Sequence, residues 1–279
     1  MKKILLISCL LVACLVFWGM GKAEAAIWTL SDVNSTVKID DSTSVGAYQW
    51  QIDGYNNLFQ HQYWYRVGSS GGEQPITNLP LISANLVGPS RLLDLKYGND
   101  SLEIRVNYLL IGGAVGSHKS DLGATVLVTN KTNSSMDFHL FKYTDFDIYS
   151  NAGFDIGTFM GLWDIWQRDQ FSGFYDESVM TPQMNLWEIA FRTSLLDKLN
   201  DGNPTTLLNQ TSPLVGGADQ FVTWAAQWDR TLTAASGPGS SYIIDEDNFI
   251  TFATPEPGTL ILLGSGLLGL WGFRKKFKN

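Results

Sequence analysis

The stretch Ser101-Leu102-Glu103-Ile104-Arg105-Val106-Asn107-Tyr108 alternates polar and apolar side chains over eight residues. Successive side chains of a β-strand point to opposite faces of a sheet, so the apolar members of this stretch share one face. Such a strand covers a hydrophobic core on one side and meets solvent on the other. The stretch therefore predicts a half-buried strand of an antiparallel sheet.

Similar patterns recur along the chain. Residues 47–53 alternate up to the turn signal Asp53-Gly54, and residues 58–67 are rich in aromatic side chains, which favour strands. Two further pairs of strand-like runs are separated by short polar or Gly/Pro-containing loops and predict hairpins. These pairs are residues 124–129 with 136–146, and residues 221–232 with 241–252.

One helix is predicted near residues 187–199, because Asn200-Asp201-Gly202 follows as a stop signal. Many strands with short loops and a single helix predict an all-β fold. We expect a single antiparallel β-sandwich, jelly-roll-like, formed by residues 26–254. A body of this size is long enough to build one core.

The N-terminus has the composition of a secretory signal peptide. Lys2 and Lys3 precede an apolar run over residues 4–20, and Ala23 and Ala25 supply the small residues that a signal peptidase needs. Residues 1–25 are therefore predicted to be removed. A competing hypothesis is a lipoprotein, because Leu11-Val12-Ala13-Cys14 resembles a lipobox that would leave Cys14 lipidated.

Cysteine and charge distributions agree with export. Both cysteines, Cys9 and Cys14, lie within the predicted signal peptide, so a mature chain would contain neither disulfides nor thiolate ligands. Between Ala26 and Pro255 there are 12 Lys and Arg against 25 Asp and Glu, a net charge of −13. Such an acidic body repels nucleic acid and anionic lipid, so we expect no nucleic-acid partner.

The C-terminus contains three parts in a fixed order. Pro255-Glu256-Pro257-Gly258 comes first, an apolar segment over residues 259–273 follows, and a basic tail closes the chain. The tail contains Arg274, Lys275, Lys276 and Lys278. Residues 258–273 would span about 24 Å as a helix, a short transmembrane segment that lysine side chains can extend by snorkelling. Because positive residues stay cytoplasmic, the acidic body is expected to be translocated.

This order of parts, together with an N-terminal signal peptide, resembles the PEP-CTERM sorting signal of Gram-negative bacteria. The resemblance covers residues 255–279 and leaves the family of the body open. It implies recognition by exosortase, a membrane protease, after transient anchoring in the inner membrane. It also implies delivery to the cell surface or to an extracellular matrix or biofilm that contains exopolysaccharide. A plain membrane anchor that stays in place is the alternative.

No catalytic motif with a supporting context occurs in the body. Gly68-Ser69-Ser70-Gly71-Gly72 matches the nucleophile pattern Gly-x-Ser-x-Gly, but Pro75 follows where that motif requires a helix. The histidines His61, His118 and His139 share no short spacing, and we expect satisfied surface or edge histidines rather than a triad or zinc site. The body is therefore predicted to be non-enzymatic.

Two acidic stretches are candidate calcium sites. Residues 144–155 resemble the start of a calcium loop, but Ser150 and Ile156 stand where an EF-hand needs Gly and a bidentate Glu. The alternative for both stretches is turn chemistry, in which Asp side chains bind their own backbone. The candidate ligands are Asp145, Asp147, Asp155, Asp245 and Asp247. Otherwise no cofactor is expected.

Trp163 and Trp166 are candidate sugar-stacking residues. They are three residues apart, so within a strand they would point to opposite faces and one could be exposed. Most other tryptophans are expected to fill the cysteine-free core, and at least one of Trp224 and Trp228 should be buried.

Three hypotheses follow for the function. The favoured one is a structural or adhesive matrix protein, associated with exopolysaccharide or biofilm and lacking catalysis. The second is a carbohydrate-binding or glycan-processing enzyme with paired carboxylates along an aromatic cleft. The third is a lipoprotein retained in the membrane through Cys14.

Overall fold

The computed structural model describes residues 26–150 and 153–252, which form two antiparallel sheets of nine strands each. Sheet 1 has the order β1 (Ile27–Asp32), β2 (Ser35–Asp40), β3 (Ala47–Ile52), β5 (Leu58–Val67), β11 (Met136–Phe146), β17 (Val222–Leu232) and β15 (Leu186–Phe191), with β4 (Tyr55–Asn56) beside β3 and β6 (Gln74–Pro75) beside β5. Sheet 2 has the order β16 (Leu214–Val215), β12 (Asp155–Gly161), β13 (Asp164–Asp169), β14 (Phe174–Thr181), β18 (Ser241–Phe252), β10 (Ser120–Asn130), β9 (Leu102–Gly112), β8 (Leu92–Gly98) and β7 (Leu81–Val87). The helical elements are α2 (Arg192–Asn200) and the 3₁₀ turns Ile76–Asn78 and Ile148–Ser150.

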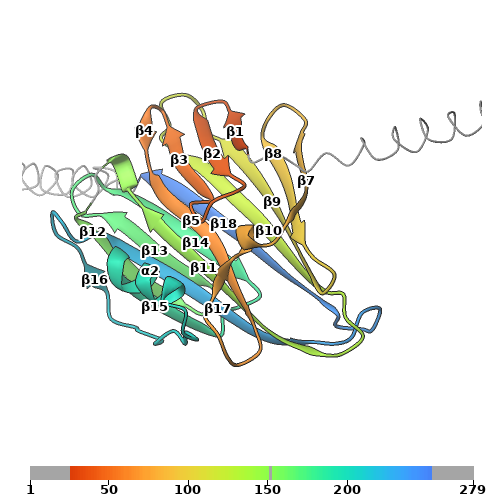
Figure 1. The fold of residues 1–279 in the computed structure, drawn as a ribbon. Coiled ribbons are helices and arrows are strands. Elements are labelled where there is room, and N and C mark those ends of the chain that lie inside the picture. The colour runs from red at the N-terminus through yellow and green to blue at the C-terminus, as the bar shows by residue number, and fades with distance from the viewer. Residues whose placement is uncertain (1–25, 151–152, 253–279) are drawn as a thin grey trace, which may run out of the picture.

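The two sheets stack face to face as a β-sandwich (Figure 1), which confirms the predicted class. The jelly-roll expectation is wrong in topology. A jelly roll has eight strands in two Greek keys, whereas sheet 2 joins two meanders, β7 to β10 and β12 to β14, through β18. Short connections between sequence neighbours favour this up-and-down order.

Neither predicted hairpin exists. β10 belongs to sheet 2 and β11 to sheet 1, and β17 and β18 are likewise in different sheets. Their connections are corners that carry the chain from one sheet to the other. Buried Asn130 holds these corners, because its Nδ2 donates to the carbonyls of Ser134 and Thr233, each at 2.8 Å. The Ala235 N–H also donates to the Thr132 carbonyl, so this hydrogen bond links the β17–β18 corner to the β10–β11 corner.

The helix predicted near residues 187–199 is only partly correct. Its first part is strand β15, which pairs with β17, and the helix begins at Arg192. Trp187 and Ile189 are buried in the sandwich core, so strand pairing overrides the local helical pattern. The predicted stop is confirmed, since α2 ends at Asn200.

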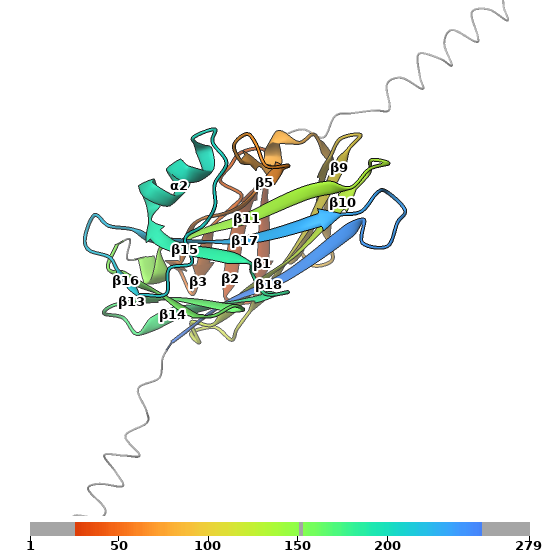
Figure 2. The same cartoon turned by 90° about the horizontal axis from the view of Figure 1, so that it is seen from below.

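Aromatic side chains fill the interior, as expected for a core without disulfides. Trp50, Trp224 and Trp228 are fully buried between the sheets. The helix α2 lies against the outer face of sheet 1 (Figure 2). A second apolar cluster joins Trp64 and Tyr143 of that sheet to Leu195 and Leu199 of α2. The outer face of sheet 1 is therefore covered around β5, β11, β15 and β17, whereas β1 to β3 and sheet 2 have no such cover among the described residues.

Candidate functional site

A charged network lies at the centre of the sandwich. Glu246 of β18 shares the inward face with Ile244 and Ile250, so its carboxylate enters the core. Glu246 Oε1 accepts a hydrogen bond from Tyr63 Oη at 2.6 Å and lies 2.9 Å from His61 Nε2, both on β5 of sheet 1. The carboxylate thus bridges the two sheets.

Lys142 of β11 completes the network. Its Nζ lies 2.9 Å from Glu246 Oε2, donates to Asn248 Oδ1 at 3.0 Å, and sits 4.4 Å from the ring centre of Trp224. Asn248 Oδ1 also accepts from the Ser178 hydroxyl at 2.9 Å. The buried ammonium therefore has an anion, an amide oxygen and an aromatic face as partners, which offset the cost of its desolvation.

The electrostatics of the network favour one ion pair. Burial by itself raises the pKa of Glu246, but Lys142 and His61 outweigh burial and bring that pKa to about 2. Burial lowers the pKa of His61, and the charge of Glu246 only partly offsets this. Burial also lowers the pKa of Lys142, and the charge of Glu246 opposes this shift. The lowered pKa values of Glu246 and His61 favour an ionised Glu246 and a neutral His61.

An imidazole beside a carboxylate has the composition of an acid–base pair. Here, however, His61 and Tyr63 are at most 1% exposed and Glu246 only 3%, so a substrate cannot reach them in this conformation. The expectation that His61 is a surface or edge histidine is wrong, because β5 lies inside sheet 1. The sequence analysis also missed Glu246. Glu246 is two residues after Ile244 in the same strand, so both side chains point to the same face, and this alternation could have placed Glu246 in the core.

The first candidate calcium stretch is organised by an arginine. Arg192, at the start of α2, binds the carboxylate of Asp145 through Nε and Nη2, and its Nη2 lies 3.5 Å from Asp147 Oδ1. The guanidinium is also flanked by the rings of Phe59 and Phe221, at 3.9 and 4.2 Å. The structure thus brings Asp145 and Asp147 together around a cation that the protein itself provides.

Asp155 occupies a separate buried position on β12. Gln167 Nε2 donates to its Oδ2 at 2.7 Å, and burial raises the pKa of Asp155 to about 9. Burial likewise raises the pKa of Asp145 to about 6, even though Arg192 opposes it. Asp155 therefore retains its proton at neutral pH, and a protonated carboxyl is a poor calcium ligand. Within residues 26–150 and 153–252, no group of three or more His, Asp or Glu is placed to hold a metal.

The second candidate pair points to the outer face of sheet 2. Asp245 accepts a hydrogen bond from Thr125 Oγ1 at 2.7 Å. Asp247 lies near Asp121 of β10, whose pKa is raised to about 6 by burial and by the charge of Asp247. These carboxylates lie along an exposed strand rather than in a closed loop.

The two candidate sugar-stacking tryptophans lie at one end of the open face of sheet 2. Trp163 is in the turn before β13 and is 46% exposed, so the expectation that both residues lie in a strand is wrong. Trp166 is within β13 and stacks on Tyr175 at 5.1 Å between ring centres. Its Nε1 donates to Asp164 Oδ2 at 2.8 Å, which fixes the indole on this face.

The other two histidines also lie beside carboxylates, as expected for satisfied histidines. His139 Nδ1 is 2.5 Å from Asp229 Oδ1 on the outer face of sheet 1. His118, in the β9–β10 loop, lies 3.6 Å from Asp53 and lines a cavity of about 510 Å³ with Tyr149 and Phe174. Asp53 mainly orders this loop, because it accepts the backbone N–H groups of Gly116 and His118.

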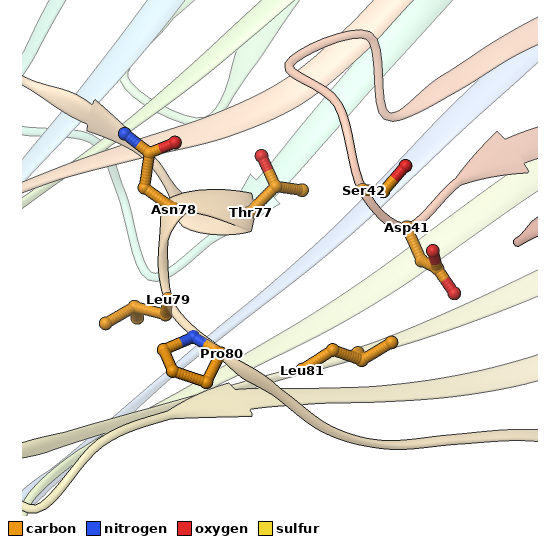
Figure 3. Close-up of a pocket in the computed structure, with 7 residues that line it drawn as sticks. All are labelled: Asp41, Ser42, Thr77, Asn78, Leu79, Pro80 and Leu81. Carbon is orange, nitrogen blue, oxygen red and sulfur yellow. The ribbon is translucent and has the colours of Figure 1, made fainter. Parts of the chain in front are cut away.

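A smaller cavity of about 310 Å³ separates the Asp41-Ser42 loop from the segment that leads into β7 (Figure 3). Asp41 has a structural role, because its two carboxylate oxygens accept hydrogen bonds from the Ala26 N–H and from Trp28 Nε1, both at 2.8 Å. Leu79, Pro80 and Leu81 form the opposite wall. This cavity offers little free polar chemistry.

Several predicted features lie outside the described residues: the signal-cleavage residues, Cys14, the Pro255–Gly258 motif, the predicted transmembrane segment and the basic tail. Among the helices that the structure describes, none has the length and apolar character to cross a membrane.

The C-terminus carries a PEP-CTERM sorting signal, since the model of the PEP-CTERM protein-sorting motif matches residues 253–276. This motif implies export and processing by exosortase. It covers only the end of the chain, so the family of the body is not resolved. No curated protein matches the chain.

Solved structures of similar fold include a putative aldose 1-epimerase from Escherichia coli K12, with 11% identity and a TM-score of 0.52 over 82% of this chain and 100% of that chain. A GalM/aldose epimerase homologue from C. elegans has 6% identity and a TM-score of 0.53, over 83% and 100% of the two chains. A bacterial glucoamylase complexed with acarbose has 10% identity and a TM-score of 0.52, and this chain, matched over 88% of its length, spans only 36% of it. At these identities the similarity shows the fold.

Replacing the buried cation tests the central network. We expect Lys142→Met to lower the free energy of unfolding by about 3–5 kcal/mol, because Glu246 is left buried without its cation. The double variant Lys142→Met/Glu246→Gln should recover part of this loss. Urea unfolding provides the measurement. The control is Lys96→Met, which breaks a partly exposed pair 3.2 Å from Glu103 and should cost less than about 1 kcal/mol. Equal costs for the two single variants would contradict a central role for the network.

Asp155 should make stability depend on pH. Its pKa rises from 3.8 to about 9 on folding, so the folded state binds more protons and stability falls as pH rises from about 4 to 9. Asp155→Asn should remove this slope, so the variant gains up to about 1.4 kcal/mol per pH unit relative to the parent. Urea unfolding at pH 5, 7 and 8.5 measures it. Asp245→Asn, which removes an exposed carboxylate, serves as the control; a parallel pH dependence in the Asp155 variant and the parent would disprove the assignment.

Proposed function

We propose that the body is a non-catalytic structural or adhesive protein that exosortase delivers to the cell surface or extracellular matrix, where it contacts exopolysaccharide. The observation that carries the proposal is the placement of its chemistry. The His61–Glu246 pair is sealed within the core, whereas aromatic rings are presented on an open sheet face. A protein built this way can bind a polymer along its surface without transforming it.

The delivery route rests on the sorting signal. The transmembrane segment at residues 259–273 would hold the protein at the inner membrane, and the Pro255–Gly258 motif would present the chain to exosortase. The net charge of −13 between residues 26 and 255 keeps the released body soluble and away from anionic lipid.

The proposed carbohydrate contact is the end of sheet 2 around Trp163, Trp166 and Tyr175. Flat aromatic rings can stack on the apolar face of a sugar, and neighbouring polar groups can bind its hydroxyls. Asp164 and Glu177 provide such groups, since Glu177 pairs with Trp166 across β13 and β14. An open sheet face suits a long polymer better than a small sugar.

A glycan-processing enzyme is the second candidate function, because His61 and Glu246 form a hydrogen-bonded pair in a fold that resembles aldose epimerases. This function would require the sandwich to open. The third hypothesis, a lipoprotein anchored through Cys14, predicts a lipid at the N-terminus and a retained C-terminal segment.

The binding proposal predicts that the protein is retarded in gels containing exopolysaccharide from its host. Trp163→Ala and Trp166→Ala should each weaken binding about tenfold, equivalent to a loss of about 1.4 kcal/mol of stacking. Phe171→Ala is the matched control, since Phe171 is an exposed aromatic at the opposite end of β13. No retardation of the folded parent would reject the contact. Release of reducing sugar, or accelerated anomer exchange that is lost in Glu246→Gln, would support the enzyme instead.

The sorting proposal predicts two processed ends. Intact mass spectrometry of protein from the host surface fraction should give a chain that begins near Ala26 and ends near Pro257. A mass that keeps residues 260–279 would show a retained anchor and would contradict matrix release. A lipid on Cys14 would select the lipoprotein hypothesis.

A further inference from the structure

Strand β7 is an open edge of sheet 2. It is the last strand in the sheet order, and only β8 pairs with it among the described residues. An edge strand presents a row of unpaired N–H and C=O groups that another strand can bind. Proteins usually block such edges with charges, proline, bulges or covering segments.

Within residues 26–150 and 153–252, the other sheet ends are short or partly bonded to neighbouring segments. In β1, the Ser31 N–H donates to the Ser90 carbonyl. In β15, the Trp187 carbonyl accepts from the Asn209 N–H, and the Trp187 N–H donates to Asn209 Oδ1. β16 has only two residues. Among the sheet ends described, β7 is the longest strand, and no described segment pairs with its outer edge. Its register with β8 shifts between Leu81 and Ser83, so its regular part is residues 83–87.

The composition of β7 is also unusual for an exposed edge. No charged residue occurs between Gln74 and Ser90, in a body whose net charge is −13. Ile82, Leu86 and Val87 are each 40–49% exposed. An uncharged, partly apolar strand of this length is typical of pairing segments rather than of solvated edges.

We propose that β7 is a homodimer interface, at which it pairs antiparallel with β7 of a second copy of this chain. Two identical strands pair antiparallel about a two-fold axis, so the same surface serves both copies. A register centred on Ala84 places Ser83 opposite Asn85 of the second copy, within the part of β7 that follows the register shift between Leu81 and Ser83. The absence of charge lets two acidic bodies approach here without like charges opposing each other in the new ladder.

The edge also limits the assembly. Pro80 and Pro89 bracket β7, and proline cannot donate to a strand ladder, so pairing stops at either end. Because the other described sheet ends are partly occupied or very short, we expect a second copy to close the assembly as a dimer rather than propagate a fibre. The inference is independent of the carbohydrate contact. A single strand pair buries little area, so we expect a concentration-dependent dimer.

Sedimentation equilibrium of the full-length chain in detergent should show a monomer–dimer equilibrium. Leu86→Lys should raise the dissociation constant at least tenfold, because it places a charged side chain on the paired edge of each copy. Ile27→Lys on β1 makes the same exchange at another exposed edge residue and should leave the equilibrium unchanged. Since both variants keep the C-terminal segment, association through that segment would affect them equally. A parent that stays monomeric, or equal effects of the two variants, would overturn the proposal.

Cysteine cross-linking tests the same interface without weakening it. In a background with Cys9→Ser and Cys14→Ser, Ala84→Cys should form an intermolecular disulfide on mild oxidation, because residues opposed across an antiparallel pair lie within bridging distance. Thr29→Cys on β1 is the control and should stay reduced. Cross-linking at Ser83 or Asn85 in place of Ala84 would support the edge pairing in a shifted register. No cross-link above the control at any of the three positions would overturn the pairing.

Discussion

The ion pair between Glu246 and Lys142 is the contact on which the rest of this sandwich depends. It joins a strand of sheet 2 to a strand of sheet 1 in a core without disulfides, and Tyr63 and His61 contact the other carboxylate oxygen, Oε1. A buried charge is tolerated only while its partners are in place, so the network favours one alignment of the two sheets over its alternatives. The same burial keeps His61 and Glu246 out of contact with solvent in this conformation.

The alternation of polar and apolar residues was sufficient to predict the strands that have one face in solvent. Residues 102–108 alternate because one face packs on the core, and the structure extends this strand to Gly112. The pattern could not say which sheet a strand joins. A five-residue polar loop reads the same whether it closes a hairpin or carries the chain between sheets, and the deciding contact is the side chain of Asn130 across to Thr233, more than a hundred residues away. Residues 187–191 form a strand for a similar reason, since β17 provides their backbone partners.

The candidate site was harder to predict because it contains a charged residue, Glu246, at a strand position where the alternating pattern requires an apolar one. Glu246 stands between two outward-facing aspartates, so a reading by composition groups all three as one acidic surface stretch. Its inward position follows from strand parity, but a charge on a core face is acceptable only with Lys142, which lies on another strand of the other sheet. The distance along the sequence between Lys142 and Glu246 gives no indication that the two residues pair. Trp163 and Trp166 could be proposed from sequence because an aromatic residue on an open sheet face needs no distant partner.

Surface architecture connects the two proposals for the body. Pairing through β7 about a two-fold axis perpendicular to the sheet would extend sheet 2 across both copies, so their outer faces would point to the same side. Each copy would then present its Trp163–Trp166 end at opposite extremes of one continuous surface. A long polysaccharide that reached both ends would be held by two individually weak contacts, and the second contact would form at the high effective concentration set by the rigid sheet. On the two proposals together, stacking that is weak in one body would add up to adhesion in a pair.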